Sequence, residues 1–285
     1  MSVRSRLRAA IDAGEIVFAP LALDALMARI AEQAGFQAVY LSGGALGYAH
    51  AVSEALLTLD ELVHATRRVV ARSEVAVIAD AGVGFGDAVH MTRTIREIEA
   101  TGAAAVEIED QVAPKRVSHH RGIEHLVAPA EMAAKVEHAV RARNDADFVV
   151  IARTGAVRNE SFEHTVRRAN LYREAGADML MLMPATDAQW SDAPKRINGP
   201  LATISSLDTR RADAWRDLGW SLVVDPFTAQ AVVVDALRSL YGHFMTEGET
   251  GTDRQRILEI YRMLSGLAGL EPLYAIEDET TERAP

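Results

Sequence analysis

The sequence predicts a single (β/α)₈ barrel, the TIM-barrel fold, with an extra helix at the C-terminus. Three observations lead to this prediction. The chain has 285 residues, a length at which such barrels commonly form one domain. Short, nearly continuous apolar runs alternate with amphipathic segments along the chain, which is typical of a parallel sheet buried on both faces. Glycines recur where predicted helices end and strands begin, because glycine tolerates the left-handed conformation common at that point.

Eight segments are predicted to be strands because each is a short apolar run. In chain order they are residues 16–20, 38–42, 75–80, 104–109, 148–153, 179–184, 201–205 and 222–225. The amphipathic segments between them are predicted to be helices, and they cover residues 23–34, 59–71, 88–101, 130–143, 163–175 and 229–246. A further helix at residues 187–198 is the weakest prediction, because Pro194 interrupts it.

Local signals agree with this division into strand–helix units. Four glycines stand just before the second, fourth, sixth and eighth predicted strands, namely Gly35, Gly102, Gly176 and Gly219. Thr58 and Glu61 have the spacing of a capping box at the start of a helix. A doubly wound open sheet is the alternative architecture, but its nucleotide-binding motifs GxGxxG and GxxxxGK[ST] do not occur in the sequence.

The C-terminal segment extends beyond the eight units. Residues 252–265 are predicted to form the additional helix, and the charged residues 277–285 are predicted to form a frayed tail. We therefore expect one barrel domain over residues 1–285, with residues 252–285 as its C-terminal helix and tail. Ile257, Ile260 and Leu264 on that helix need an apolar cover.

Composition excludes several classes of function. The formal net charge is −10, which argues against a nucleic acid or an anionic membrane as a partner. The absence of cysteine excludes disulfides, thiolate metal sites and a cysteine nucleophile. No apolar run approaches the roughly 20 residues of a membrane helix, and the N-terminus lacks a signal-peptide core. The expected location is therefore the cytoplasm.

Polar residues end several predicted strands, where the chemistry of a barrel is found. Ser42, Asp80, Glu109, Arg153 and Ser205 occupy such positions. Any one of them alone could be a strand end that simply meets solvent. Two carboxylates and an arginine from three successive strands, however, converge on one mouth of the barrel and together favour a site. The carboxylates of Asp80 and Glu109 suit Mg²⁺, held directly or through water.

Two loops add candidate site residues. The protein as a whole is acidic, yet the loop after the fourth strand has five basic or titratable residues within a stretch of seven. These are Lys115, Arg116, His119, His120 and Arg121. The loop is therefore predicted to be a lid over an anionic substrate. A solvated basic loop is the alternative. The loop after the second strand begins with Gly43 and Gly44, whose N–H groups can approach an anion, and it includes Glu54.

Five stretches of the chain resemble the isocitrate lyase/phosphoenolpyruvate mutase superfamily. They are YLSGG at 40–44, DAGVGFG at 80–86, EDQVAPKR at 109–116, IART at 151–154 and EAGAD at 174–178. The likeness runs in unbroken order from about residue 6 to residue 242. It implies an α/β barrel whose terminal helix is exchanged between subunits of a homodimer or a homotetramer. It also implies Mg²⁺, with Mn²⁺ as a substitute, and a small 2-oxo or 2-hydroxy carboxylate substrate.

The resemblance also implies roles for individual residues. Asp80 is similar to the direct Mg²⁺ ligand and Glu109 to a water-mediated one. The substrate-binding positions it implies are Tyr40, Ser42, Gly43, Gly44, Arg153, Thr203 and Ser205. Lys115 and His119 match catalytic groups of the family's gating loop, and Arg153 also belongs to the implied catalytic set. Glu54 lies close to the position of a family aspartate.

The chain departs from the lyase pattern at several positions. Val117 stands where the lyases have a cysteine that acts as general acid, and a valine cannot transfer a proton. Gly82 and Gly155 replace aspartates, and Ala185 replaces a glutamate at the end of the sixth strand. Thr203 and Ser205 replace an Asn and a Thr that bind substrate. The Asn-Ser pair of the mutase-type loop is also absent.

These features predict a Mg²⁺-dependent carbon–carbon lyase or decarboxylase. Its expected substrate is a small 2-oxo or 2-hydroxy dicarboxylic acid that reacts through an enolate. One alternative is a P–C-bond enzyme of the phosphonomutase or phosphonopyruvate hydrolase type. Another is a barrel with altered or lost catalysis that binds a small carboxylate.

Overall fold

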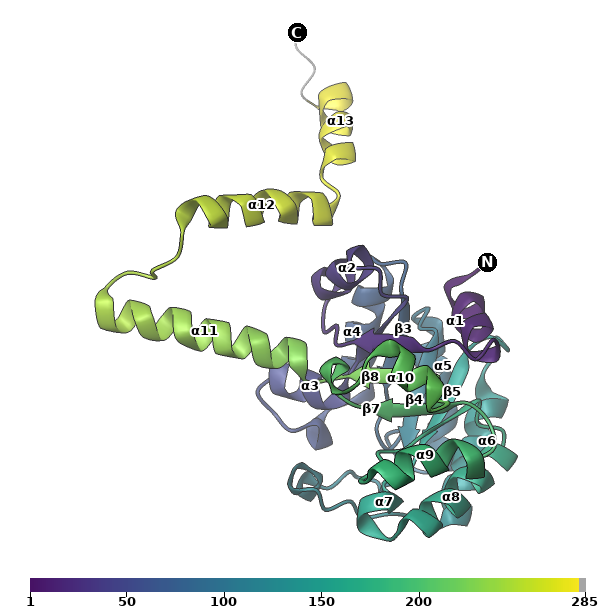
Figure 1. Ribbon diagram of the computed structural model, residues 1–285. Helices are drawn as coiled ribbons and strands as arrows, with labels where there is room; N and C mark the ends of the chain where they lie inside the picture. The colour runs from purple at the N-terminus through teal and green to yellow at the C-terminus, as the bar shows by residue number, and fades with distance from the viewer. Residues whose placement is uncertain (282–285) are drawn as a thin grey trace. The chain divides into compact units, whose positions relative to one another are not determined.

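A computed structural model describes residues 1–281 and contains eight parallel strands with helices between them (Figure 1). The strands are β1 (Val17–Pro20), β2 (Ala38–Leu41), β3 (Ala76–Asp80), β4 (Ala105–Glu109), β5 (Val149–Arg153), β6 (Met179–Met181), β7 (Leu201–Ile204) and β8 (Leu222–Asp225). The strands pair in the order β1-β8-β7-β6-β5-β4-β3-β2. A parallel bridge between Leu21, just after β1, and Tyr40 in β2 joins the two ends of this order. The predicted barrel is therefore confirmed, and every strand lies within its predicted segment.

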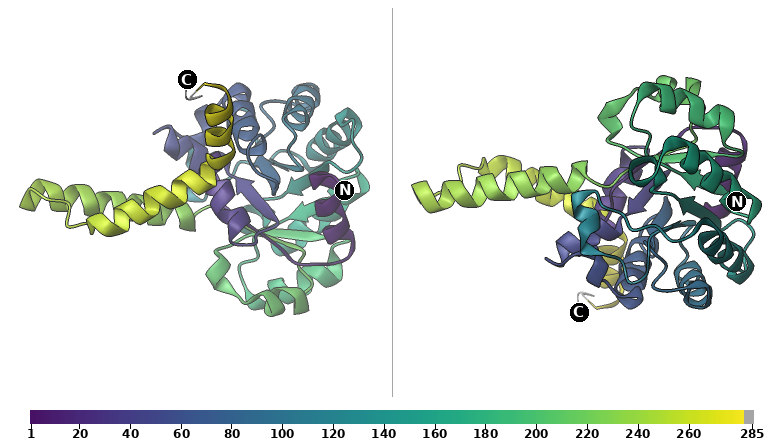
Figure 2. Two further views of the ribbon diagram at one scale, coloured as in Figure 1. Left: turned by 90° about the horizontal axis from the view of Figure 1, so that it is seen from above. Right: turned by 90° about the horizontal axis from the view of Figure 1, so that it is seen from below.

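The helices divide between two compact units of the chain, Met1–Gln230 and the residues from Ala231 onward. The helices that lie wholly within the first unit are α1 (Val3–Asp12), α2 (Ala25–Gln33), α3 (Gly43–Ala49), α4 (Leu59–Val70), α5 (Ala88–Ala100), α6 (Pro129–Ala142), α7 (Ala156–Asn159), α8 (Phe162–Glu174), α9 (Asp187–Arg196) and α10 (Ala212–Asp217). Figure 2 shows the first unit from two further sides. None of the helices among residues 1–281 is long and apolar enough to cross a membrane.

The second unit holds most of α11 (Thr228–Glu247), followed by α12 (Arg254–Ala268) and α13 (Glu271–Thr280). The side chain of Asp253 caps the start of α12, and Gly269 ends it with a φ of +68°. The segment that we predicted as one helix and a frayed tail thus contains two helices. The predicted tail overlaps α13 up to Thr280, and its last four residues lie outside the described part of the chain.

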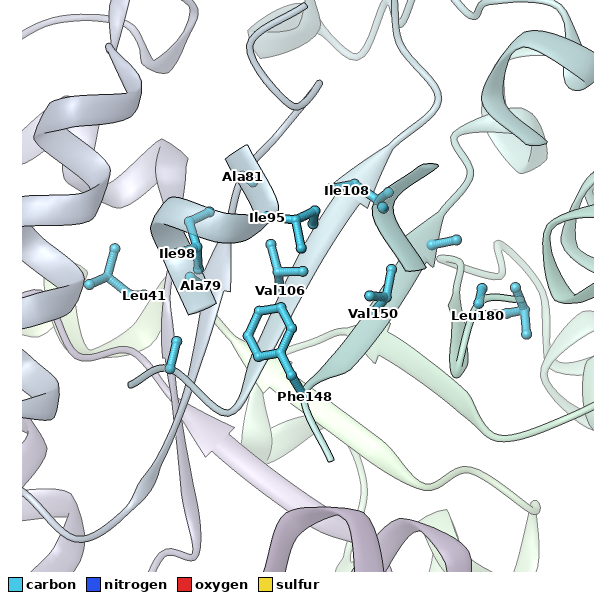
Figure 3. Close-up of a cluster of buried hydrophobic side chains, with 14 of the residues drawn as sticks. Leu41, Ala79, Ala81, Ile95, Ile98, Val106, Ile108, Phe148, Val150 and Leu180 are labelled. Carbon is cyan, nitrogen blue, oxygen red and sulfur yellow. The ribbon is translucent and has the colours of Figure 1, made fainter. Parts of the chain in front are cut away.

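The side chains of each strand alternate between two apolar layers. Residues such as Ala38, Ile78 and Ile151 pack inside the barrel. Their neighbours on the same strands pack outward against the helices, and Figure 3 shows part of this outer layer, including Leu41, Ala79, Val106, Val150 and the α5 residues Ile95 and Ile98. This two-sided burial explains why the strands appear in the sequence as continuous apolar runs.

Helix α1 closes the N-terminal end of the barrel. Its residues Leu7, Ala10 and Ile11 belong to the inner apolar layer. Arg4 donates to the carbonyl of Ala103 over 2.8 Å, just before β4. Arg8 pairs with Asp178 over 2.8 Å, just before β6. The helix was not predicted from the sequence. With this end covered, the C-terminal ends of the strands form the only other mouth of the barrel.

The weak helix at 187–198 is present as α9, with Pro194 inside it. A proline leaves the carbonyl four residues earlier without its helical donor. Here that carbonyl belongs to Trp190, and the indole N–H of Trp220 donates to it over 3.2 Å. A tertiary contact thus satisfies the carbonyl that the proline leaves free, which explains why the helix continues.

Two of the predicted helix-ending glycines provide a matched stability test. Gly35 and Gly102 have φ values of +93° and +92°, but a Cβ would meet nothing within 4 Å at Gly35, whereas at Gly102 it would lie 2.8 Å from Val70 Cγ1. We expect Gly35→Ala to lower the free energy of unfolding by about 1 kcal/mol through backbone strain alone. Gly102→Ala should cost at least about 1 kcal/mol more, because the stiff valine must move. Urea titrations that give equal losses would contradict this assignment.

Candidate active site

Charged side chains replace apolar ones where β3, β4 and β5 end. Asp80 ends β3, Glu109 ends β4 and Arg153 ends β5. Each lies an even number of residues after an inner-layer residue of its strand, so its side chain faces the barrel interior. Asp80 and Glu109 are 6% and 1% exposed. Ionised carboxylates buried to this extent require hydrogen bonds or opposite charges close by.

Asp80 is held by backbone N–H groups. Gly43 donates to its Oδ2 and Gly82 to its Oδ1, each over 2.9 Å. Gly43 is the first residue of helix α3, so the two glycines of the YLSGG stretch begin a helix rather than a loop, and the Gly43 N–H is used by Asp80. A Cβ on Gly43 would lie 3.3 Å from Asp80 Oδ2 and 3.1 Å from Glu54 Oε2. Burial raises the pKa of Asp80, and the nearby charge of Glu54 raises it further.

Lys115 lies between two of the carboxylates. Its Nζ is 2.6 Å from Glu54 Oε1 and 2.6 Å from Glu109 Oε1. Burial alone would lower the pKa of Lys115, but the charges of Glu109, Glu54 and Asp80 outweigh it and raise the pKa. Burial likewise opposes ionisation of Glu109, yet Lys115 and Arg153 lower its pKa below the usual value. The ammonium therefore links the loop after β2 to the end of β4.

His119 forms an ion pair with the same glutamate, Glu54. Its Nδ1 is 2.7 Å from the carbonyl of Arg116, which can only accept, so this nitrogen carries a proton. Burial opposes the charged imidazole, but Glu54 and the Arg116 carbonyl raise the pKa of His119. Burial also acts against ionised Glu54, yet His119 and Lys115 lower the pKa of Glu54 to about 2. The pair is a buried carboxylate facing an imidazolium.

Glu107 belongs to the same cluster, although the sequence analysis missed it. Its carboxyl accepts a hydrogen bond from the hydroxyl of Tyr40, and its Oε1 lies 3.3 Å from Arg153 Nη1. Burial and the charge of Asp80 raise the pKa of Glu107 to about 8. Burial also raises the pKa of Tyr40. The signal was available, because Glu107 lies two residues before Glu109 and strand periodicity places both on one face.

Arg153 contacts three carboxylates. Its Nη1 is 3.3 Å from Glu107 Oε1 and from Glu109 Oε2, and its Nη2 is 3.3 Å from Glu124 Oε1. Burial opposes its charge, but Glu109, Glu107 and Glu124 raise the pKa of the guanidinium. Glu124 was also missed, because it lies in an irregular loop where no periodicity indicates which way a side chain points.

Of the other predicted substrate-binding residues, Gly44 borders the cluster, whereas the hydroxyls of Ser42 and Ser205 bond to groups outside it. Ser42 is the N-cap of α3, and its hydroxyl accepts from the Ala45 N–H. Ser205 bonds Thr209 over 2.9 Å in the loop after β7. The strand neighbours of Thr203 pack with the inner layer, so Thr203 faces the helices and its hydroxyl is buried without a hydrogen-bond partner among the described residues. Gly44 would place a Cβ 3.6 Å from Glu54 Oε2.

A cavity of about 810 Å³ borders the cluster. Asp80, Glu54, Lys115 and Gly82 line one part of it, and Lys135 lines another. A Cβ on Gly82 would lie 3.8 Å from Glu109 Oε1, so the glycine leaves room beside that carboxylate. Within residues 1–281 there is no group of three or more His, Asp or Glu side chains that could hold a metal ion. Mg²⁺ commonly binds one or two carboxylates and keeps several waters, so the pair Asp80 and Glu109 fits it.

A second histidine, His120, connects the basic loop to the loop after β2. The two ring nitrogens of His120 lie 3.0 Å from the Tyr48 hydroxyl and 2.9 Å from the Ser53 hydroxyl. Its ring contacts the ring of His119, with centroids 3.9 Å apart and planes tilted by 39°. The loop after β4 is thus joined to the loop after β2 by His120, His119 and Lys115 together.

Comparison with known proteins identifies the relatives of this chain. A family model described as phosphoenolpyruvate phosphomutase matches residues 7–241. The chain is 37% identical over 261 residues to the 2-methylisocitrate lyase of Aeropyrum pernix, covering 90% of this chain and 83% of the relative. It is 31% identical over 291 residues to the 2,3-dimethylmalate lyase of Eubacterium barkeri, covering 97% and 98%.

A solved structure supports the same grouping. The complex of phosphonopyruvate hydrolase with oxalate and Mg²⁺ matches with a TM-score of 0.86 at 30% identity, covering 99% of this chain and 100% of the other. The span matched by the family model contains all eight strands and the whole charged cluster. The resemblance inferred from the sequence motifs is therefore confirmed, and the chain belongs to the isocitrate lyase/phosphoenolpyruvate mutase superfamily.

Proposed function

We propose that this chain is a divalent-cation-dependent lyase or decarboxylase that acts on a small 2-oxo or 2-hydroxy dicarboxylic acid through an enolate. The observation that carries the proposal is the buried cluster in which Asp80 and Glu109 lie beside Arg153 under a basic loop. Relatives named as 2-methylisocitrate lyase and 2,3-dimethylmalate lyase support carbon–carbon cleavage. The match to phosphonopyruvate hydrolase favours P–C-bond cleavage as the second candidate.

In this proposal Asp80 and Glu109 hold Mg²⁺ or Mn²⁺. Carboxylate oxygens are the ligands that these ions prefer, and the raised pKa of Asp80 reflects a buried carboxylate that still lacks enough positive charge nearby. When bound, the ion supplies positive charge that stabilises an enolate oxygen. Gly82, in place of the second aspartate of the family motif, would weaken the hold on water molecules around the ion.

Arg153 is the proposed binding group for a substrate carboxylate. A guanidinium presents paired N–H donors that match a carboxylate. Tyr40, which donates to Glu107, and Gly43, which donates to Asp80, are the other proposed contacts. Arg153 already forms ion pairs with three glutamates. A substrate carboxylate that binds to Arg153 must therefore replace at least one of these glutamate contacts. Of the other predicted binding residues, Ser42, Gly44, Thr203 and Ser205 remain predictions.

The proton step separates the two kinds of carbon–carbon cleavage. Loss of CO₂ from a 2-oxo diacid leaves the electron pair of the broken bond in an enolate, which then takes up one proton. In retro-aldol cleavage a base takes the proton of the 2-hydroxyl group, the C–C bond breaks as the carbonyl forms, and the departing carbanion takes up one proton. The lyase pattern assigns that last step to a cysteine, and this chain has Val117 there. His119, protonated and paired with Glu54, is the proposed proton donor, with Lys115 as the second candidate.

A homodimer or homotetramer built partly from the C-terminal helices, and a cytoplasmic location, complete the proposal. Exposed apolar residues on α12, such as Ile257 and Leu258, support a role for this helix in assembly.

Removal of the Asp80 charge should abolish metal binding. We expect Mg²⁺ in about 100-fold excess over its dissociation constant to stabilise the wild-type protein by about 2.7 kcal/mol. Asp80→Asn should lose most of this increment, because the neutral amide is a poor ligand. Thermal unfolding with and without Mg²⁺ measures it. Asp192→Asn changes a side chain that is 51% exposed and pairs with Lys195; it is the control and should keep the full increment. An equal Mg²⁺ response in Asp80→Asn would remove this metal site.

The substrate preference of the enzyme tests the assignment of His119 as the proton donor. We expect oxaloacetate or a substituted relative to be turned over with higher kcat/KM than methylisocitrate, and His119→Ala to lower kcat by about 10²-fold. The control is His164→Ala, because His164 on α8 pairs with Glu160, which lies just before that helix and outside the cluster. Release of pyruvate, CO₂ and phosphate, each measured directly, separates decarboxylation from P–C cleavage. Efficient cleavage of methylisocitrate, or full activity of His119→Ala, would overturn the assignment.

A further inference from the structure

Glu124 is fixed in place by Asn159, the last residue of α7. The Glu124 N–H donates to Asn159 Oδ1 over 3.0 Å, and Asn159 Nδ2 donates to Glu124 Oε2 over 3.1 Å. The same Nδ2 also donates to the carbonyl of Gly155 over 2.9 Å. Both the backbone and the side chain of Glu124 are therefore held by one residue, and its carboxylate is 10% exposed. A side chain held at two points loses little further freedom when it binds an arginine.

The space that the Glu124 carboxylate occupies exists because residue 155 is glycine. Gly155 has φ −86° and ψ 6°, which any residue can adopt, so the backbone conformation does not require glycine. A Cβ at this position would lie 1.7 Å from Glu124 Oε2 and 2.8 Å from its carboxyl carbon. Any side chain at 155 would displace the carboxylate. Positions 124 and 155 are thus sterically coupled.

The Glu124 carboxylate, which fills this space, contacts Nη2 of Arg153. Glu107 and Glu109 both contact Nη1 of the guanidinium, whereas Glu124 contacts Nη2 over 3.3 Å. Within residues 1–281, Glu124 is the only ion-pair partner of Nη2. A planar group that is held at one nitrogen alone can still turn about its own bonds. The contact at the second nitrogen fixes the plane of the guanidinium.

We propose that Glu124, seated in the space left by Gly155, is a positioning residue that sets the orientation in which Arg153 meets a substrate carboxylate. The proposal rests on the proposed function, in which Arg153 binds that carboxylate. A contrasting role is that of a placeholder, which would leave Arg153 when substrate arrives. The two hydrogen bonds from Asn159 argue against it, because a displaceable carboxylate would not be anchored at both its backbone and its side chain.

The test uses the full-length protein with Mg²⁺ and oxalate as the probe. Glu124→Gln keeps the side-chain volume but removes the charge, so we expect oxalate affinity measured by calorimetry to fall about 10-fold, the loss of one charged hydrogen bond. Gly155→Ala should give a similar loss, because its Cβ displaces the carboxylate. Glu137→Gln, the same change at an exposed residue of α6 paired with Arg141, is the control and should bind as the wild type does.

A relocated carboxylate distinguishes positioning from general damage to the fold. Glu124→Ala should lose affinity, and addition of Gly155→Asp should restore most of it, because the new carboxylate arises within the same space. Gly155→Ala should cost little further in a Glu124→Ala background. Wild-type affinity in Glu124→Gln would overturn the proposal, and so would tighter binding, which would indicate a placeholder. Failure of the Gly155→Asp rescue, together with a lowered melting temperature in every variant, would also reject it.

One further readout keeps this proposal separate from the proposed function. If the wild-type protein binds no oxalate in the presence of Mg²⁺, the proposed function fails. Crystal structures of the ligand-free wild type and Glu124→Gln would still decide the positioning claim. We expect the Arg153 guanidinium to be ordered in the first and rotated or disordered in the second. An unchanged Arg153 side chain in Glu124→Gln would overturn the claim.

Discussion

The structure of this mouth of the barrel depends on the cost of burying carboxylates. Asp80 at the end of β3 and both Glu107 and Glu109 on β4 have almost no exposure, and an unpaired ionised carboxylate in such a place costs several kcal/mol. Only Arg153 comes from the barrel wall to offset them. The second cation, Lys115, comes from the loop after β4 and pairs with Glu109 and Glu54. The loop after β4 therefore supplies part of the positive charge that compensates the buried carboxylates.

The carboxyl groups of the cluster differ in the direction in which their surroundings shift their pKa values. Glu109 and Glu54 are held ionised by the cations beside them, whereas Glu107, bonded to Tyr40, has its pKa raised to about 8. Asp80 receives only two backbone N–H groups and has a raised pKa. A divalent cation at Asp80 would supply the charge that the protein does not. In the proposed function, a cation at Asp80, a substrate carboxylate at Arg153 and a proton from His119 would together fit chemistry through an enolate.

Much of this arrangement could be predicted from the sequence because it follows from regular structure. Buried strands appear as apolar runs, and the last polar residue of a run marks the mouth of the barrel, which located Asp80, Glu109 and Arg153. The same periodicity places Thr203 on the helix-facing side, so its predicted role in substrate binding conflicts with its strand register. The role of Glu124 could not be predicted, because its side-chain position depends on the backbone of an irregular loop and on the absence of a side chain at Gly155. Neither feature follows the periodicity of a strand or a helix.

The central claim is that the buried cluster at the ends of β3, β4 and β5 binds a divalent cation and a substrate carboxylate together. Anomalous scattering from a crystal of the protein with Mn²⁺ and oxalate tests it most directly, because Mn²⁺ can be located independently of any assumption about the site. The account predicts a manganese peak beside the carboxylate of Asp80, with oxalate between the ion and Arg153. A manganese peak elsewhere, or oxalate that does not approach Arg153, would contradict it.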